Sequence, residues 1–154
     1  IDSVFHGVEW YQKNKKCFVD NVLLLQPTSP LREIADLEFS LNLFVEKNLE
    51  SLVSVTKMYE HPFECIETSD ESNWNYLRRP KGKLSRRQDY YGKFGFIDGS
   101  FYLAKYSFLK KNKNFVVQGI TYPYFTTQKY PVDIDEVNDL YLVECLLKKN
   151  KVNL

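Results

Sequence analysis

The chain has 154 residues, of which 44% are hydrophobic and 16% aromatic, and this is enough for one domain with a core of its own. Its formal net charge of +1 gives no support for a nucleic-acid partner, and no apolar run is long enough for a transmembrane helix. Three dispersed cysteines (Cys17, Cys65 and Cys145) indicate reduced thiols rather than a disulfide framework, so we predict a cytoplasmic protein.

Helix and strand patterns alternate along the first part of the chain. Residues 2–14 have apolar side chains at the spacing of one helix face. Residues 22–25 form a short apolar run, which is typical of a strand buried on both faces. An amphipathic helix should follow, with Ser29 as its N-cap and Pro30 at its first position. The expected apolar face of this helix consists of Leu31, Ile34, Leu37, Leu41, Phe44 and Val45.

The later patterns complete an α/β chain with one interruption. Residues 51–58 indicate another buried strand, and the order helix–strand–helix–strand predicts an open sheet with parallel strands. The pattern breaks over residues 64–93, which are polar and resemble an excursion from the sheet. Beyond it we expect a strand over 96–104, a short helix over 106–111, a β-rich segment over 115–125, and a last helix whose apolar face is Val137, Leu140, Tyr141, Val143 and Leu147.

The first candidate site is the corner in "LLLQPTSPLR", where Gln26 follows a strand. In open α/β sheets, ligands bind outside the carboxyl ends of the strands. The amide of Gln26 can both donate and accept hydrogen bonds, and the following helix N-terminus favours an anion. The alternative is that the Pro-Thr-Ser-Pro corner is a rigid helix cap and nothing more.

The second candidate is "VDID", which contains Asp133 and Asp135. On an extended chain, residues i and i+2 point the same way and lie roughly 6.5 to 7 Å apart. Two such carboxylates can hold one divalent cation, and Mg²⁺ commonly takes one or two carboxylates together with substrate phosphates. The alternative is that Asp135 caps the last helix while Asp133 is solvated.

The third candidate is a basic cluster on the excursion. Arginine side chains match carboxylates and phosphates. The alternatives are a solvated charged loop or an RNA-binding patch, for which the nearly neutral chain is a poor match. The cluster consists of Arg78, Arg79, Lys81, Lys83, Arg86 and Arg87, and Gln88 closes it.

Several motifs taken in order resemble one family. "LLLQPTSPLR", "EHPFE", "RRQD", "DGSFYLA" and "DIDEVNDL" are similar to the N-acylneuraminate (sialic acid) cytidylyltransferases, and the resemblance covers nearly the whole chain. The wider group includes the legionaminic and pseudaminic acid enzymes. The resemblance implies a Rossmann-like, open, mostly parallel sheet flanked by helices. It also implies a CMP-sugar synthetase, in which the anomeric hydroxyl of a nine-carbon acid sugar attacks the α-phosphate of CTP and releases pyrophosphate.

The same resemblance assigns roles to individual residues. Gln26 would contact the acid sugar, and Mg²⁺ would be the cofactor. Arg87 and Gln88 would be catalytic residues in the sugar or triphosphate site. The further substrate-binding residues would be Thr28, Ser29, Arg32 and Arg86, and the metal ligands would be Asp133 and Asp135.

The chain departs from the family pattern in two places. No segment resembles the R-x-G-S-K phosphate loop, so we expect residues 1–154 to be the C-terminal two-thirds of a nucleotidyltransferase domain that lacks most of the CTP site. The family usually has Asn where this chain has Asp98 before Gly99, and Asp lacks the amide donor.

The family also predicts a homodimer, with residues 65–93 as the dimerisation and substrate excursion. The alternative functions are an octulosonic acid cytidylyltransferase and a non-catalytic binding module of the same fold. The sequence identifies neither the exact sugar nor the catalytic base.

Overall fold

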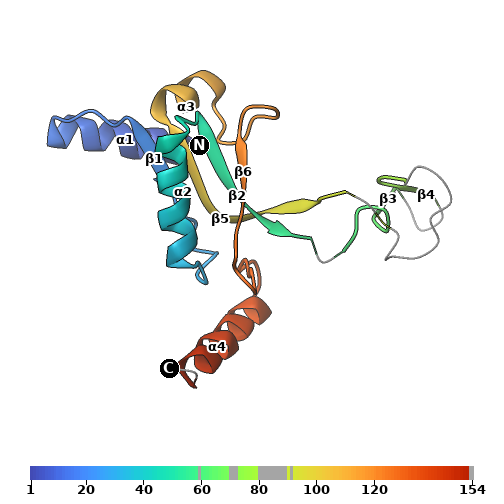
Figure 1. Ribbon diagram of the computed structural model, residues 1–154. Helices are drawn as coiled ribbons and strands as arrows, with labels where there is room; N and C mark the ends of the chain where they lie inside the picture. Colours follow the sequence, from blue (N-terminus) through green and yellow to red (C-terminus); the bar gives the residue numbers. More distant parts are fainter. Residues whose placement is uncertain (59, 70–72, 80–89, 91, 153–154) are drawn as a thin grey trace. The chain divides into compact units, whose positions relative to one another are not determined.

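The computed structural model describes residues 1–58, 60–69, 73–79, 90 and 92–152, and side chains of the last helix as far as residue 149 (Figure 1). The chain forms two compact units. The first unit combines Ile1–Thr56 with Ile97–Leu154, and the second consists of Lys57–Phe96.

The first unit is built on a mixed four-stranded sheet. Its strand order is β1 (Asn21–Leu24), β5 (Gly95–Lys105), β2 (Ser51–Lys57) and β6 (Tyr122–Phe125). Strands β1 and β5 are antiparallel, whereas β2 and β6 are parallel. The expectation of a mostly parallel sheet is therefore wrong for β5, although the α/β class is confirmed.

Two hydrogen bonds establish the direction of β5 against β2. The Lys105 N–H donates to the carbonyl of Glu50 at 3.0 Å, and the Phe101 N–H donates to Oγ of Ser54 at 3.0 Å. The residue number rises from 50 to 54 along β2 while that of the partner falls from 105 to 101 along β5, so the two strands run in opposite directions. Strand β5 thus begins at the edge where β1 and β2 end.

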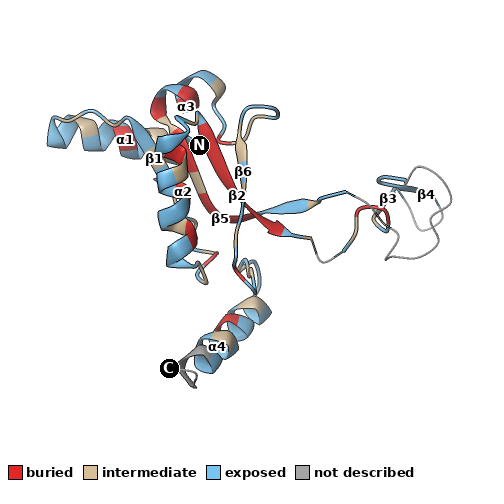
Figure 2. Cartoon of the chain, viewed as in Figure 1, coloured by how far each residue is buried: buried red, intermediate tan, exposed pale blue. Residues whose placement is uncertain are grey.

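Helices cover both faces of this sheet. On one face, Phe44 of α2 (Ile34–Glu46) belongs to a core cluster with Phe101 and Leu103 of β5. On the other face, α3 (Tyr106–Asn112) contributes to a second cluster that also contacts α1 (Asp2–Lys15). Figure 2 shows that burial is concentrated in β2 and β5. The arrangement is compatible with a Rossmann-like fold.

Strand β1 differs from the expected strand buried on both faces. Leu23 and Leu25 are exposed, whereas Val22 and Leu24 pack against the second core cluster. The reason is position, because β1 is an end strand of the sheet and only one of its faces is covered.

Helix α2 begins later than its sequence predicts, and the side of the helix that is buried differs from the predicted apolar side. Its N-cap is Glu33, so Ser29 and Pro30 precede the helix and the predicted cap is wrong. The helix buries Asp36, Ser40 and Phe44, and it exposes Ile34, Leu41 and Val45. Asp36 and Ser40 are buried because each has hydrogen-bond partners inside the unit.

Two further expectations at the C-terminal end need correction. Within residues 115–125, strand structure is confined to β6, and a turn precedes it. Helix α4 (Val137–Val152) forms as predicted and buries Val143. The other members of its predicted apolar face, Val137, Leu140, Tyr141 and Leu147, are exposed.

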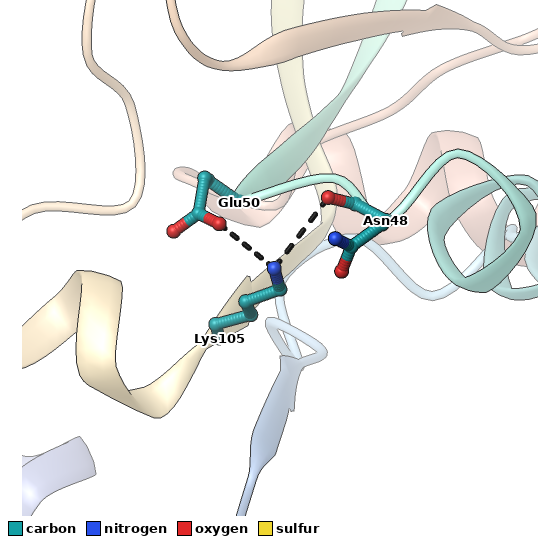
Figure 3. A network of polar contacts seen from close by, with 3 residues as sticks. All are labelled: Asn48, Glu50 and Lys105. Carbon is teal, nitrogen blue, oxygen red and sulfur yellow. Dashed lines mark hydrogen bonds and ion pairs between the residues drawn. The ribbon is translucent and has the colours of Figure 1, made fainter.

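A polar clip holds the turn between α2 and β2 to the end of β5 (Figure 3). Nζ of Lys105 lies 2.7 Å from a carboxylate oxygen of Glu50, and it also donates to the carbonyl of Asn48 at 3.5 Å. Asn48 has a φ of 48°, in the left-handed region that Asn tolerates better than most residues.

The second unit has secondary structure and an aromatic cluster of its own. Strands β3 (Ile66–Thr68) and β4 (Trp74–Tyr76) form an antiparallel pair. The ring of His61 lies with its centroid 4.6 Å from those of Phe63 and Tyr90. Of these three residues only Tyr90 belongs to the segment 64–93 that the sequence predicts to be polar.

Two bulk expectations can be compared with the structure. None of the helices in the described part of the chain is long and apolar enough to cross a membrane. Cys17, Cys65 and Cys145 are all free thiols, as the sequence predicts.

Candidate functional site

Three predicted site residues meet around Gly99. A Cβ atom placed on Gly99 would lie 2.6 Å from Oε1 of Gln26, 3.5 Å from Oγ of Ser29 and 3.8 Å from Oδ2 of Asp133. Gly99 has a φ of 72°, which L side chains rarely adopt. We call Gln26, Ser29, Gly99 and Asp133 the corner site. It lies where β1 ends, the edge at which ligands bind in open α/β sheets.

The corner after β1 is fastened to the segment that contains Asp133. Ser29 is only 2% exposed, and its hydroxyl donates to Oδ1 of Asp133 at 3.4 Å. The carbonyl of Thr28 accepts a hydrogen bond from the N–H of Ile134 at 2.8 Å. The corner is thus tied down by a distant segment as well as by its prolines, and Ser29 contacts Asp133 instead of capping a helix.

Arg32 links the end of β1 to β5. Its guanidinium donates through Nε to the carbonyl of Ser100 at 2.5 Å and through a terminal nitrogen to the carbonyl of Gln26. Burial lowers the pKa of Arg32 from its ordinary value. These contacts give Arg32 a clamping role, and its predicted contact with substrate stays a prediction.

A buried carboxylate lies directly behind the corner site. Asp98 is 6% exposed and accepts hydrogen bonds from Oγ of Ser54 at 2.5 Å and from the N–H of Ser100 at 3.0 Å. Burial, and then the charges of Asp98 and Asp133, raise the pKa of the Tyr102 hydroxyl. Two acids, Asp98 and Asp133, and the guanidinium of Arg32 therefore lie at this edge of the sheet.

The two carboxylates of "VDID" have different surroundings. Asp133 is exposed and contacts Ser29, whereas the N–H of Asp135 donates to a carboxylate oxygen of Asp139 at 3.0 Å. The same oxygen accepts from the N–H of Glu136 at 2.9 Å, so Asp139 closes the first turn of α4. At the start of α4 the Asp139 carboxylate thus accepts two backbone N–H groups, and the alternative role of Asp135 as the helix cap stays a prediction.

The oxygen ligands at this position fit a hard cation such as Mg²⁺. Asp133 supplies an exposed carboxylate, and the hydroxyl of Ser29 orients it. Among the residues that the structure describes, no group of three or more His, Cys, Asp or Glu side chains gathers to hold a metal. A site of one or two carboxylates that substrate phosphates complete remains compatible with this finding.

The predicted catalytic pair lies outside the described residues. Arg87 and Gln88, as well as Arg86, fall in the segment 80–89. From the same basic cluster, the guanidinium of Arg78 stacks 5.1 Å from the ring of Phe94, and that of Arg79 lies 5.0 Å from the ring of Tyr76.

Sequence reasoning singled out Asp98 only as a departure from the family pattern, and it did not predict that Asp98 and Asp36 are buried. Asp98 lies in a segment read as a plain strand, although Asp-Gly is also a turn signal. Asp36 accepts hydrogen bonds from the Tyr124 hydroxyl at 3.0 Å and from the N–H of Thr127 at 2.8 Å. An acid in a helix's first turn is ordinary, so no local signal marks Asp36 as buried.

The comparisons with known proteins include a distant relative. No protein-family model matches the chain. The chain is 24% identical over 152 residues to post-translational flagellin modification protein B of Campylobacter coli. The match covers 98% of this chain and 61% of that protein, so the chain spans about three-fifths of the relative's length. The match is compatible with the sugar-nucleotide resemblance without singling out a member of that family.

Proposed function

We propose that the full-length protein is a cytidylyltransferase that transfers CMP from CTP to the anomeric hydroxyl of a nonulosonic acid and releases pyrophosphate. The observation that carries this proposal is the convergence of Gln26, Ser29 and Asp133 on Gly99. An amide and a carboxylate meet there at the carboxyl end of a strand, which is the position used for ligands in α/β sheets. The family resemblance of the ordered motifs supplies the reaction.

The proposed reaction needs one group that orients the sugar and another that binds the metal ion. The amide of Gln26 can donate to and accept from the hydroxyl and acid groups of a sugar, and so orient it. Asp133, with Asp135 after it, would hold Mg²⁺, which would neutralise charge on the phosphates and orient the displacement. Ser29 holds the Asp133 carboxylate toward the corner.

The remaining predicted roles are part of the same proposal. We assign Arg32, Thr28 and Arg86 to substrate binding, and we assign Arg87 and Gln88 to the chemistry of the triphosphate or sugar. Two of the N–H donors of Arg32 bind the carbonyls of Gln26 and Ser100, and guanidinium has further donors for an acid group.

The relative supports this proposal in a general way. Its name places it in the post-translational modification of flagellin. Attaching a sugar to a protein requires an activated sugar donor, and a CMP-sugar synthetase produces one. A match over nearly the whole chain indicates that the corner site belongs to a segment shared with that protein.

The test is an assay of the full-length protein with CTP, MgCl₂ and a set of acid sugars. We expect ³¹P NMR to show a CMP-sugar and pyrophosphate with a nine-carbon acid, and EDTA to stop the reaction. Turnover of an eight-carbon octulosonic acid alone would favour that alternative. Binding of an acid sugar without turnover would favour the non-catalytic module, and neither binding nor turnover would contradict the proposal.

We also propose that the protein is a cytoplasmic homodimer, with residues 65–93 reaching the partner subunit. Apolar side chains gathered on a surface are typical of protein interfaces. The second unit carries such a group on and beside its β3–β4 pair, consisting of the exposed residues Ile66, Trp74, Tyr76 and Leu77.

A further inference from the structure

Asp98 is a buried acid that has no role in the proposed reaction. Oδ1 of Asp98 accepts from Oγ of Ser54 in β2 and from the N–H of Ser100 in β5. Oδ2 accepts from Oγ1 of Thr126, the residue after β6, at 3.4 Å. One carboxylate therefore joins three strands of the sheet at the edge where the corner site lies.

These hydrogen bonds hold the chain on both sides of Gly99. Asp98 precedes Gly99, and its carboxylate bonds to the N–H of Ser100, which follows Gly99. The hydroxyl of Ser100 also donates to Oε1 of the buried Gln128 at 3.2 Å. Gly99 keeps its left-handed φ of 72° between two anchored neighbours.

Gln26 is linked to residues 99–100 through its backbone and through its side chain. Its carbonyl is linked to the carbonyl of Ser100 through the guanidinium of Arg32, which donates to both. Its side-chain Oε1 lies so close to Gly99 that a Cβ there would approach it to 2.6 Å. The backbone and the side chain of Gln26 thus both lie against residues 99–100.

We propose that Asp98 is a positioning residue that holds Gly99 in place and thereby sets the position of the Gln26 side-chain amide. The placement of Gln26 follows from the geometry of this chain alone. The consequence for catalysis, a correctly oriented acid sugar, rests on the proposed function. Asp98 need not touch the substrate to have this effect.

The hydrogen-bond pattern predicts which replacement will be tolerated. An Asn amide oxygen can accept from Ser54 and from the N–H of Ser100, as Oδ1 does now. Its NH₂ group can donate to Oγ1 of Thr126, whose own proton can go to the carbonyl of Val55 at 3.4 Å. Asp98→Asn should therefore keep the arrangement, and Asp98→Ala should lose it.

The first test follows the Gln26 side-chain amide by ¹⁵N NMR, with its signals assigned by their loss in Gln26→Ala. In Asp98→Ala we expect these signals to move toward those of an exposed glutamine such as Gln118. In Asp98→Asn they should stay close to their wild-type positions. In Gly99→Ala they should also move, because the added Cβ would meet Oε1 of Gln26 and because an L side chain is strained at the φ of 72°.

A matched control separates positioning from general stability. Asp36 is a second buried acid of the same unit, 3% exposed, and it accepts hydrogen bonds from Tyr124 and Thr127 rather than from residues 98–100. Asp36→Asn should lower the midpoint of thermal unfolding without moving the Gln26 amide signals. A folded Asp98→Ala protein with unchanged Gln26 signals would overturn the proposal.

A milder variant covers the case in which Asp98→Ala does not fold. Thr126→Val removes the hydroxyl that reaches Oδ2 of Asp98 and the carbonyl of Val55, but leaves both hydrogen bonds to Oδ1 of Asp98 in place, and it should give a smaller shift of the Gln26 amide in the same direction. Unchanged Gln26 signals in a folded Thr126→Val protein, together with unchanged signals in Gly99→Ala, would overturn the proposal equally.

The second test is kinetic and uses the full-length protein. Asp98→Ala should raise the KM for the acid sugar and leave that for CTP unchanged, and Asp98→Asn should restore it. In a Gln26→Ala background, Asp98→Ala should have no further effect on the sugar KM, because both changes act through one amide. An independent, additive effect would contradict the proposal. If the wild type makes no CMP-sugar, the proposed function fails, while the NMR test still decides the role of Asp98.

Discussion

The hydroxyl of Ser29 lies 3.4 Å from Oδ1 of Asp133, although 104 positions separate the two residues in the chain. The contact brings the corner after β1 together with the segment that leads into α4. Ser29 is a buried hydroxyl that has found a carboxylate partner, as buried polar groups usually must. Gln26, which we propose to bind the acid sugar, and Asp133, which we propose to bind Mg²⁺, therefore lie at one site.

The proposed metal site predicts the effect of removing its charges. Asp133→Asn combined with Asp135→Asn should abolish Mg²⁺-dependent pyrophosphate release by the full-length protein and leave its circular dichroism spectrum unchanged. The reason is that an amide oxygen is a far weaker ligand for Mg²⁺ than a carboxylate. Pyrophosphate release measured against Mg²⁺ concentration checks this, and unchanged turnover would remove the metal assignment.

Asp139 provides the control for that experiment. It is an acid of the same segment, but it accepts the N–H groups of Asp135 and Glu136 at the start of α4. Asp139→Asn should cost at most about 1 kcal/mol of stability, as for a lost helix cap, and should leave the Mg²⁺ dependence as it was.

The corner amide predicts a selective change in affinity. Gln26→Ala should raise the KM for the acid sugar several-fold and leave that for CTP nearly constant, because one hydrogen bond contributes about 1 kcal/mol. Steady-state kinetics with each substrate varied in turn measures the two constants. Gln118→Ala, at an exposed position in a turn, is the matched control and should change neither. A shift in the CTP constant alone would place the sugar elsewhere.

Tyr124 predicts a loss of stability at high pH. Burial, and then its hydrogen bond to Asp36, raise the pKa of Tyr124 to about 12. Since an unfolded tyrosine titrates near about 10, the folded state favours the neutral phenol, and this contribution is complete below pH ~10 and disappears as the pH rises through ~12.

Urea unfolding of the wild type and of Tyr124→Phe at several pH values tests whether Tyr124 causes the loss of stability at high pH. At pH 8 the variant should be less stable by about 1 to 2 kcal/mol, for one lost hydrogen bond to a charged acceptor. Between pH 10 and 12 it should lose less stability than the wild type. Parallel losses in the two proteins would show that Tyr124 does not carry the effect.

The exposed apolar side chains of the second unit predict self-association. Leu77→Asp should convert a dimer into a monomer, because a charge in an apolar interface must be desolvated. Light scattering at several protein concentrations measures the mass. Phe18→Asp, which changes an exposed apolar residue of the first unit, should leave the dimer intact. A wild type that is monomeric at high concentration would contradict the proposed homodimer.

The sequence predicted the elements better than their orientations. The strand at residues 51–57 and the helix near residues 2–15 could be read because burial and helical spacing are local patterns. The rotation of α2 could not, because Asp36 and Ser40 are polar, and only their distant or backbone partners make their burial favourable. The direction of β5 could not be predicted either, since the apolar pattern of a strand does not depend on whether its neighbours are parallel or antiparallel.

The sequence by itself determined that Gln26 follows a strand and that two acids precede the last helix, because both are patterns of neighbouring residues. The tertiary structure decided that Gln26, Ser29 and Asp133 meet at Gly99 and that Asp98 is buried, with hydrogen bonds to Ser54 and Ser100. Contacts between residues far apart in the chain depend on how the strands of the sheet pair, and a short stretch of sequence does not reveal which distant strand it will pair with.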